Sequence, residues 1–211
     1  MTTEGMAHRR VARSISVLLV VQIVTAAVGV SFVQAFMDGD SNRTALTIGA
    51  LLMMFSGLVI AAIGVLLYQV LKFTNSRLAV WVPVIRSLEC VVALAFGTYL
   101  LTNSQPVPNH LLWVYILAGA AGVILSYLLF TSRLVPRPIA ALGFIGYALL
   151  LLGVPLGFAG LIDMNEGLGQ ALIIPGALFE LIALPTWLIT KGFKPSPSVK
   201  ASRSPVLVTA S

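Results

Sequence analysis

Three ionisable residues stand inside apolar stretches of membrane-spanning length: Arg86, Glu89 and Glu180. A charge at the centre of a bilayer costs about 2.5–3.5 kcal/mol on insertion scales, so such a residue normally faces a partner or a water-filled cavity. Arg86 and Glu89 are three positions apart and therefore share one face of a helix. Together the three residues predict a binding site for a small ligand, an ion or a proton within a membrane.

The two glutamates are expected at nearly the same depth. At about 1.5 Å of rise per residue, Glu89 lies about 18 Å beyond Arg77, and Glu180 about 16.5 Å before Lys191. Both basic residues mark one edge of the membrane. Small residues share the helix faces of both glutamates, so the carboxyl groups are expected to look into a helix bundle and not into lipid.

The charges of this predicted site do not balance. We expect Arg86 to neutralise one glutamate and to leave the second carboxyl unpaired, so that it takes a proton or binds a cation. Pro185 has no N–H to donate to the carbonyl of Leu181. This free carbonyl oxygen could help Glu180 to coordinate a cation. Alternatively, the Arg–Glu contacts only lock helices together, as in a structural or regulatory subunit. Further polar residues near this depth could supplement the site or join helices by hydrogen bonds: Gln22, Thr25 and Ser56.

The elements that position these side chains must be helices. The chain is 58% hydrophobic and only 9% charged, whereas soluble domains carry roughly 25% charged residues. Lipid offers the backbone no hydrogen-bond partners, and the alternation of a β-barrel is absent. The sequence therefore predicts an all-α, polytopic transmembrane helical bundle with six membrane-spanning helices. They are expected at residues 14–36, 45–71, 78–101, 111–131, 139–161 and 171–190.

The charge distribution predicts the organisation and the orientation of the chain. Residues 1–13 form a basic cytoplasmic N-terminus, residues 14–190 the six-helix transmembrane domain, and residues 191–211 a disordered cytoplasmic tail rich in Pro and Ser. With both the N and the C terminus cytoplasmic, the inner side holds all of the 13 basic residues except Arg43 and Arg86. The net charge of +6 thus belongs to a membrane rim, and no nucleic-acid partner is expected.

The sequence carries no recognisable enzymatic machinery. No metalloprotease helix motif, nucleophile elbow or phosphate-binding loop is present. The histidines, His8 and His110, lie outside the apolar core, and the single cysteine, Cys90, has no disulfide partner within the chain. We expect no enzyme, no cofactor and no metal site. The expected partners are the lipid bilayer and the small ligand, ion or proton. Small-residue seams at residues 118–122 and 153–157 could also join two copies in a homo-oligomer, although packing within the bundle is the simpler use.

Short motifs extend along most of the chain. They lie at residues 67–72 with Asn75 and residues 78–79, at Arg86 with Glu89, at residues 132–137 and 143–147, at Pro175 with residues 179–181, and at residues 188–193. In these motifs the chain resembles the bacterial membrane proteins grouped as domain of unknown function 4386. The resemblance implies a multi-pass protein of the bacterial inner (plasma) membrane. It brings no established activity, so it assigns no role to Arg86, Glu89 or Glu180.

Overall fold

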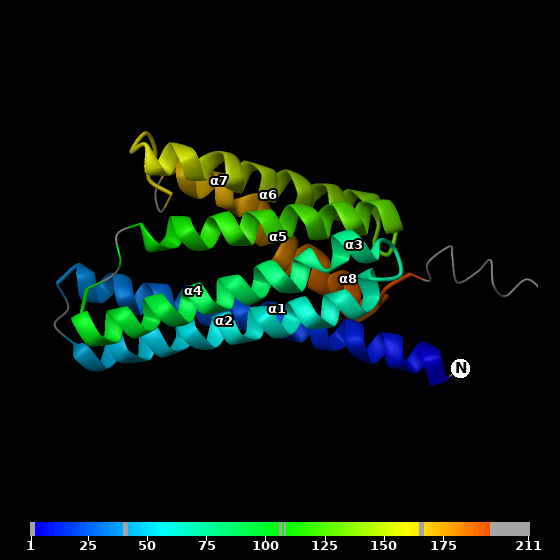
Figure 1. The fold of residues 1–211 in the computed structure, drawn as a ribbon, viewed down its shortest axis with the longest axis horizontal. Helices are drawn as coiled ribbons and strands as arrows, with labels where there is room; N and C mark the ends of the chain where they lie inside the picture. Colours follow the sequence, from blue (N-terminus) through cyan, green and yellow to red (C-terminus); the bar gives the residue numbers. More distant parts are fainter. Residues whose placement is uncertain (1–2, 40–41, 106, 108, 165–166, 195–211) are drawn as a thin grey trace, which may run out of the picture.

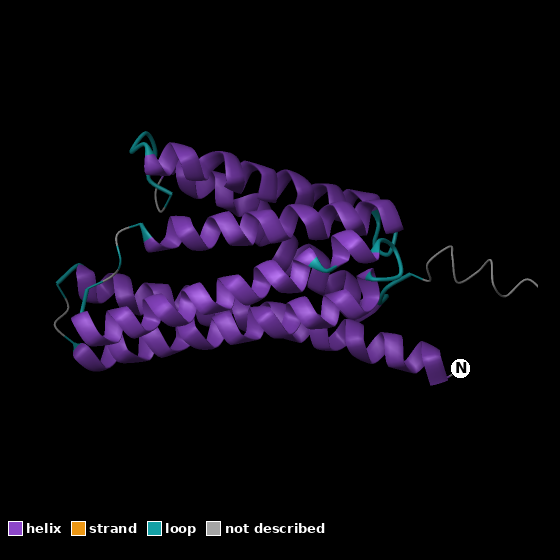
Figure 2. Cartoon of the chain, in the orientation of Figure 1, coloured by secondary structure: helices purple, strands orange, loops and turns teal. Residues whose placement is uncertain are grey.

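The computed structural model describes residues 3–39, 42–105, 107, 109–164 and 167–194. Over these residues the chain consists of helices and short connections, without strands (Figure 2). Six helical segments are long and apolar enough to cross a membrane: Arg9–Met37, Arg43–Leu71, Ser76–Asn103, His110–Ser132, Arg137–Phe158 and Gly167–Thr190. Figure 1 shows them side by side along one axis. The predicted fold class, an all-α bundle of six spans, is confirmed.

Two of the six spans are interrupted. The elements are α1 (Thr3–Met37), α2 (Arg43–Leu71), α3 (Ser76–Ala79), α4 (Trp81–Asn103), α5 (His110–Ser132), α6 (Arg137–Phe158), α7 (Gly167–Leu178), the π-helix η1 (Phe179–Ala183) and α8 (Leu184–Thr190). The third span is α3 with α4, and the sixth is α7, η1 and α8. Asparagines cap two helix starts: Asn42 Oδ1 accepts the N–H groups of Thr44 and Ala45, and Asn75 Oδ1 accepts that of Leu78.

The ends of the chain differ from the sequence-based expectation. Helix α1 begins at Thr3 and not at residue 14, because arginine has a good helix propensity and the basic segment simply continues the helix outward. After α8, the Lys194 N–H donates to the Leu134 carbonyl at 2.9 Å, and Lys194 Nζ lies 5.4 Å from the Trp187 ring centroid. Residues 191–194 are therefore packed on the bundle. The rest of the predicted tail, residues 195–211, lies outside the described residues.

The helices form two groups. Helices α1, α2 and α4 pack together, and α5 packs on α6, which packs on α7. The groups meet where α4 contacts α5 and where η1 and α8 contact α1. The start of α1 and the end of α8 lie at the same end of the bundle (Figure 1). We call it the terminal end, and the other the distal end. The loops with most of the internal basic residues are also at the terminal end.

Buried apolar side chains form two clusters. The larger one joins both helix groups at the terminal end, where Ile15, Leu71, Leu129 and Leu184 are almost fully buried. The smaller one lies at the distal end and belongs to α1, α2 and α4 alone: Val33, Leu46, Ala50 and Leu100. The two helix groups thus share a core at one end only.

Candidate functional site

The structure brings the three predicted site residues together near the middle of their spans. Arg86 Nη1 lies 2.9 Å from Glu89 Oε2, and Arg86 Nη2 lies 2.9 Å from Glu180 Oε1. The exposed fractions of the three side chains are 2%, 8% and 13%, in that order. We call these residues the triad. The expectation that one carboxyl stays unpaired is wrong, because a guanidinium presents donors in a fork and can serve two carboxylates at once.

Glycines of α2 place Arg86 by letting α4 come close. A Cβ atom added at Gly64 would lie 3.0 Å from the Cβ of Arg86, and one added at Gly57 would lie 2.8 Å from the Cβ of Ala93. Both distances are too short for a comfortable contact between carbon atoms. The close crossing of α2 and α4 therefore depends on glycine at both positions, and it holds the base of the Arg86 side chain against α2.

Glu180 stands in the π-helix η1. Pro185 has no N–H to bond the carbonyl of Leu181, and here the backbone widens by one residue, so that the N–H of Leu184 donates to the Phe179 carbonyl five positions earlier. Insertions of this kind are rare and occur often at functional sites. They change the angular phase between the residues before and after them. The prolines that the sequence placed around Glu180 thus act through the shape of the helix that carries it.

Tyr147 of α6 is a fourth polar residue of the site, and the sequence did not predict it. Its side chain interacts electrostatically with Glu180 and Arg86, and its hydroxyl makes no hydrogen bond of regular geometry within the described part of the chain. The Tyr147 ring fills space left by Gly122, where an added Cβ would overlap the ring. It packs edge-on against Phe179 at a centroid distance of 6.1 Å. The one feature of the sequence that could have pointed to Tyr147 is that its hydroxyl stands in the middle of an apolar span.

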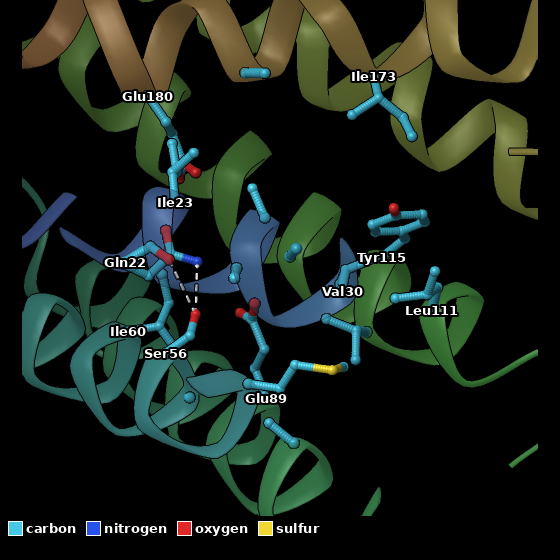
Figure 3. Close-up of a pocket in the computed structure, with 18 of the residues that line it drawn as sticks. Gln22, Ile23, Val30, Ser56, Ile60, Glu89, Leu111, Tyr115, Ile173 and Glu180 are labelled. Carbon is cyan, nitrogen blue, oxygen red and sulfur yellow. Dashed lines mark hydrogen bonds between the residues drawn. The ribbon is translucent and has the colours of Figure 1, made fainter. Parts of the chain in front are cut away.

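A cavity of about 480 Å³ adjoins the triad. Its polar end contains the triad and Tyr147, and its walls are mainly apolar side chains of α1 and α5. Phe96 and His110, whose rings contact edge-on at 6.2 Å, lie at its distal end. In Figure 3, Glu180 and Glu89 approach the cavity from opposite sides. The cavity lies between the two helix groups, and Ile60, Tyr147 and Leu150 of the larger cluster form part of its wall.

The supplementary polar residues play different parts. Gln22 Nε2 donates to Ser56 Oγ at 3.3 Å, and Ser56 Oγ donates to the Gln22 backbone carbonyl at 3.2 Å, so this pair joins α1 to α2 (Figure 3). Both residues also line the cavity. Thr25 donates only to carbonyls of its own helix, those of Val21 and Gln22. Of the three, Gln22 and Ser56 therefore belong to the site and Thr25 does not.

The site offers acceptors and one cation, and no cluster of metal ligands. Among the residues that the structure describes, no group of three or more His, Cys, Asp or Glu side chains could hold a metal ion. Cys90, next to Glu89 in the sequence, is a buried free thiol. The arrangement can hold a proton between carboxylates, or bind a cationic or hydrogen-bonding group against them.

Comparison with known proteins agrees with the sequence motifs. Residues 105–192 match the family model described as Domain of unknown function (DUF4386). This segment contains α5, α6 and the sixth span, and with them Tyr147 and Glu180, whereas Arg86 and Glu89 precede it. No curated protein and no solved structure matches the chain. The resemblance inferred from the motifs is thereby confirmed over residues 105–192, where the chain is similar to the family of domain of unknown function 4386.

Proposed function

We propose that this multi-pass membrane protein binds a small ligand, or passes a proton or a cation, at the site formed by Arg86, Glu89 and Glu180. The observation that carries the proposal is the cavity of about 480 Å³ that ends on these charges. Ligand sites are concave and mostly apolar, with a few convergent polar groups. An ion pair that only fastens helices needs no adjoining cavity.

The charge of the triad supports the same proposal. One guanidinium and two carboxylates carry a net charge of −1 when both glutamates are ionised. In a membrane interior of low dielectric constant, such a charge is costly unless it is compensated. A proton on one carboxyl group compensates it, and so does a bound cation. Binding of a cation and release of a proton are therefore linked at this site.

A second function also has a specific observation in its favour. Arg86 contacts both glutamates at 2.9 Å and thereby ties α4 to η1. A structural or regulatory membrane subunit would use the triad in this way, with the contacts only locking the third and sixth spans together. The two functions differ in what they expect of the cavity: a binding protein holds a ligand there, whereas a protein whose triad only locks helices needs no occupant.

The cellular setting is part of the proposal. We propose that both termini lie in the cytoplasm of a bacterial cell and that the helices lie in its plasma membrane, because most of the Lys and Arg residues fall on the side of the termini. We propose no enzymatic activity, since no nucleophile and base can be paired in the sequence. The lipid bilayer is the expected partner, and association of two copies remains compatible with the lipid-facing helix surfaces.

Native mass spectrometry of the protein purified from its membrane tests the proposal. The natural protein should retain a small ligand, and Glu180→Gln should lose it while keeping its fold by circular dichroism. Asp38→Asn makes the same change from carboxylate to amide on an exposed residue outside the cavity and should retain the ligand. Equal retention by Glu180→Gln and the natural protein would contradict the proposed site and favour the locking function.

A further inference from the structure

We infer that the cavity takes an amphiphilic amine, whose protonated nitrogen pairs with Glu89 and whose apolar body lies along α1 and α5. The inference rests on the proposed function and names the class of ligand for the same site. It follows from the unmatched polar atoms at one end of the cavity and from the absence of charge along its described walls.

The polar end of the cavity has acceptors that lack donors. Glu89 engages Arg86 through Oε2, and no donor to its other oxygen, Oε1, is found in the described chain. Gln22 Oε1 is a buried acceptor that likewise has no partner among the described residues. Both side chains line the cavity (Figure 3). A protonated amine fits them, because an ammonium group has N–H donors and no acceptor.

Tyr147 shows that this end of the cavity is built for a polar occupant. The residue is only 3% exposed, and its side chain lines the cavity. Its hydroxyl interacts with Glu180 and Arg86 but makes no hydrogen bond of regular geometry in the part of the chain that the structure describes. A buried hydroxyl without a well-formed hydrogen bond is costly and rare. A ligand nitrogen held between Glu89 and Tyr147 would satisfy both groups.

The charge selects a cation over an anion. The triad is negative by one unit when both carboxyl groups are ionised, so a monovalent ammonium neutralises it, and a carboxylate or phosphate would be repelled by both glutamates. Arg86 does not reverse this preference, because its two terminal nitrogens already serve Glu89 and Glu180. Its buried Nε, which has no partner among the described residues, belongs to the same single positive charge and leaves the triad negative. The ammonium replaces the proton that would otherwise sit on the triad.

The remaining volume requires an organic body. Away from the triad the cavity walls include Val30, Leu111, Val114 and Ile173. A bare inorganic cation would leave most of the 480 Å³ and this apolar wall unmatched. An alkyl or aryl group attached to the ammonium would lie along the wall toward Phe96 at the distal end.

Calorimetric titration of the full chain in lipid nanodiscs tests the assignment, with empty nanodiscs subtracted for partition into lipid. The probes are octylamine, octanol and octanoate, which share one alkyl chain and differ in the head group. Octylamine should bind at least about tenfold more tightly than octanol, as expected for a charge-assisted hydrogen bond, and octanoate more weakly than either. Glu89→Gln should lower octylamine binding to the level of octanol, and Asp38→Asn should leave it unchanged.

A second variant keeps the test decisive if Glu89→Gln fails to fold. Ala26→Phe narrows the cavity from α1 without changing a charge, and it should weaken octylamine and octanol alike. Equal binding of octanol and octylamine, both lost in Ala26→Phe, would overturn the amine assignment and leave the proposed function standing. Binding of sodium ions without octylamine binding would overturn it too. The retained-ligand measurement decides the proposed function independently.

Discussion

The same six apolar spans run from the terminal to the distal end of the bundle, yet the two ends pack differently. At the terminal end, Leu71 of α2, Leu129 of α5 and Leu184 of α8 belong to one cluster that joins both helix groups. At the distal end, Val33 and Leu100 belong to a separate cluster in α1, α2 and α4, and the cavity lies between the groups. Hydropathy alone therefore predicts which segments cross the membrane but not where they meet.

The triad stands at the boundary between these two ends. Phe179 and Leu184 pack on its terminal side, and the cavity opens on its distal side. Burial on one side forces the charges to pair, since an isolated charge there is costly. In the proposed function, the space on the other side lets the same charges meet a ligand. The difference between the two ends is thus compatible with both proposed roles of the triad, the locking of helices and the binding of a ligand.

Removal of the guanidinium should have the largest effect. Arg86→Met leaves two buried carboxyl groups without their cation and should lower the free energy of unfolding by about 3–5 kcal/mol. Denaturant titration in detergent, followed by circular dichroism, measures this loss. In the triple variant that adds Glu89→Gln and Glu180→Gln, most of the loss should be recovered, because no buried charge remains. If the triple variant stays as unstable as Arg86→Met, the charges are not the cause.

Two alanines of α1, one in the terminal cluster and one beside the cavity, test whether the two regions differ in packing. Ala12 is fully buried in the cluster at the terminal end, so Ala12→Leu should overpack it and lower the unfolding free energy by up to about 3 kcal/mol. Ala26 lines the cavity, where Ala26→Leu finds free volume and should change stability by less than about 1 kcal/mol. Thermal unfolding of both variants in one detergent makes the comparison. Equal destabilisation would mean that the distal end is as tightly packed as the terminal end.

The contact between α6 and α7 gives a sharper pair of variants. A Cβ added at Gly146 would overlap the backbone nitrogen of Gly176, whereas one added at Gly176 meets its nearest atoms at 3.7 and 3.8 Å. Gly146→Ala should therefore lower the unfolding free energy by about 1–2 kcal/mol. Gly176→Ala should be neutral or slightly stabilising, because alanine is the better helix former. If Gly146→Ala is as stable as Gly176→Ala, then α7 is free to shift away from α6 and relieve the overlap.

The sequence was sufficient for the six spans and for the approach of the three charged residues at one depth, although it predicted that Arg86 pairs with only one of the two glutamates. The spans followed from hydropathy, and the approach from the cost of an unpaired charge in lipid. Two features did not follow. The π-helix at Glu180 depends on how the chain accommodates the missing N–H of Pro185, for which the sequence allows several solutions. Tyr147 reaches the triad only because Gly122 of another helix leaves room for its ring, and such a pairing of distant positions is not visible in one sequence.

The smallest expected effect concerns a single hydrogen bond at the terminal end. Ser16 of α1 is fully buried, and its hydroxyl lies 3.2 Å from the carbonyl of Pro185 in α8. Ser16→Ala removes this link and should cost about 0.6 kcal/mol, as measured on average for hydrogen bonds between membrane helices. Ser31 of α1, at the distal end, bonds only the carbonyl of Ala27 in its own helix, so Ser31→Ala should change nothing measurable. Because the Ser16 hydroxyl also lies 3.0 Å from the Ala12 carbonyl, its proton can serve either acceptor, which keeps the interhelical contribution small. A loss above about 2 kcal/mol in Ser16→Ala would show that polar contacts, and not apolar packing, hold the terminal end together.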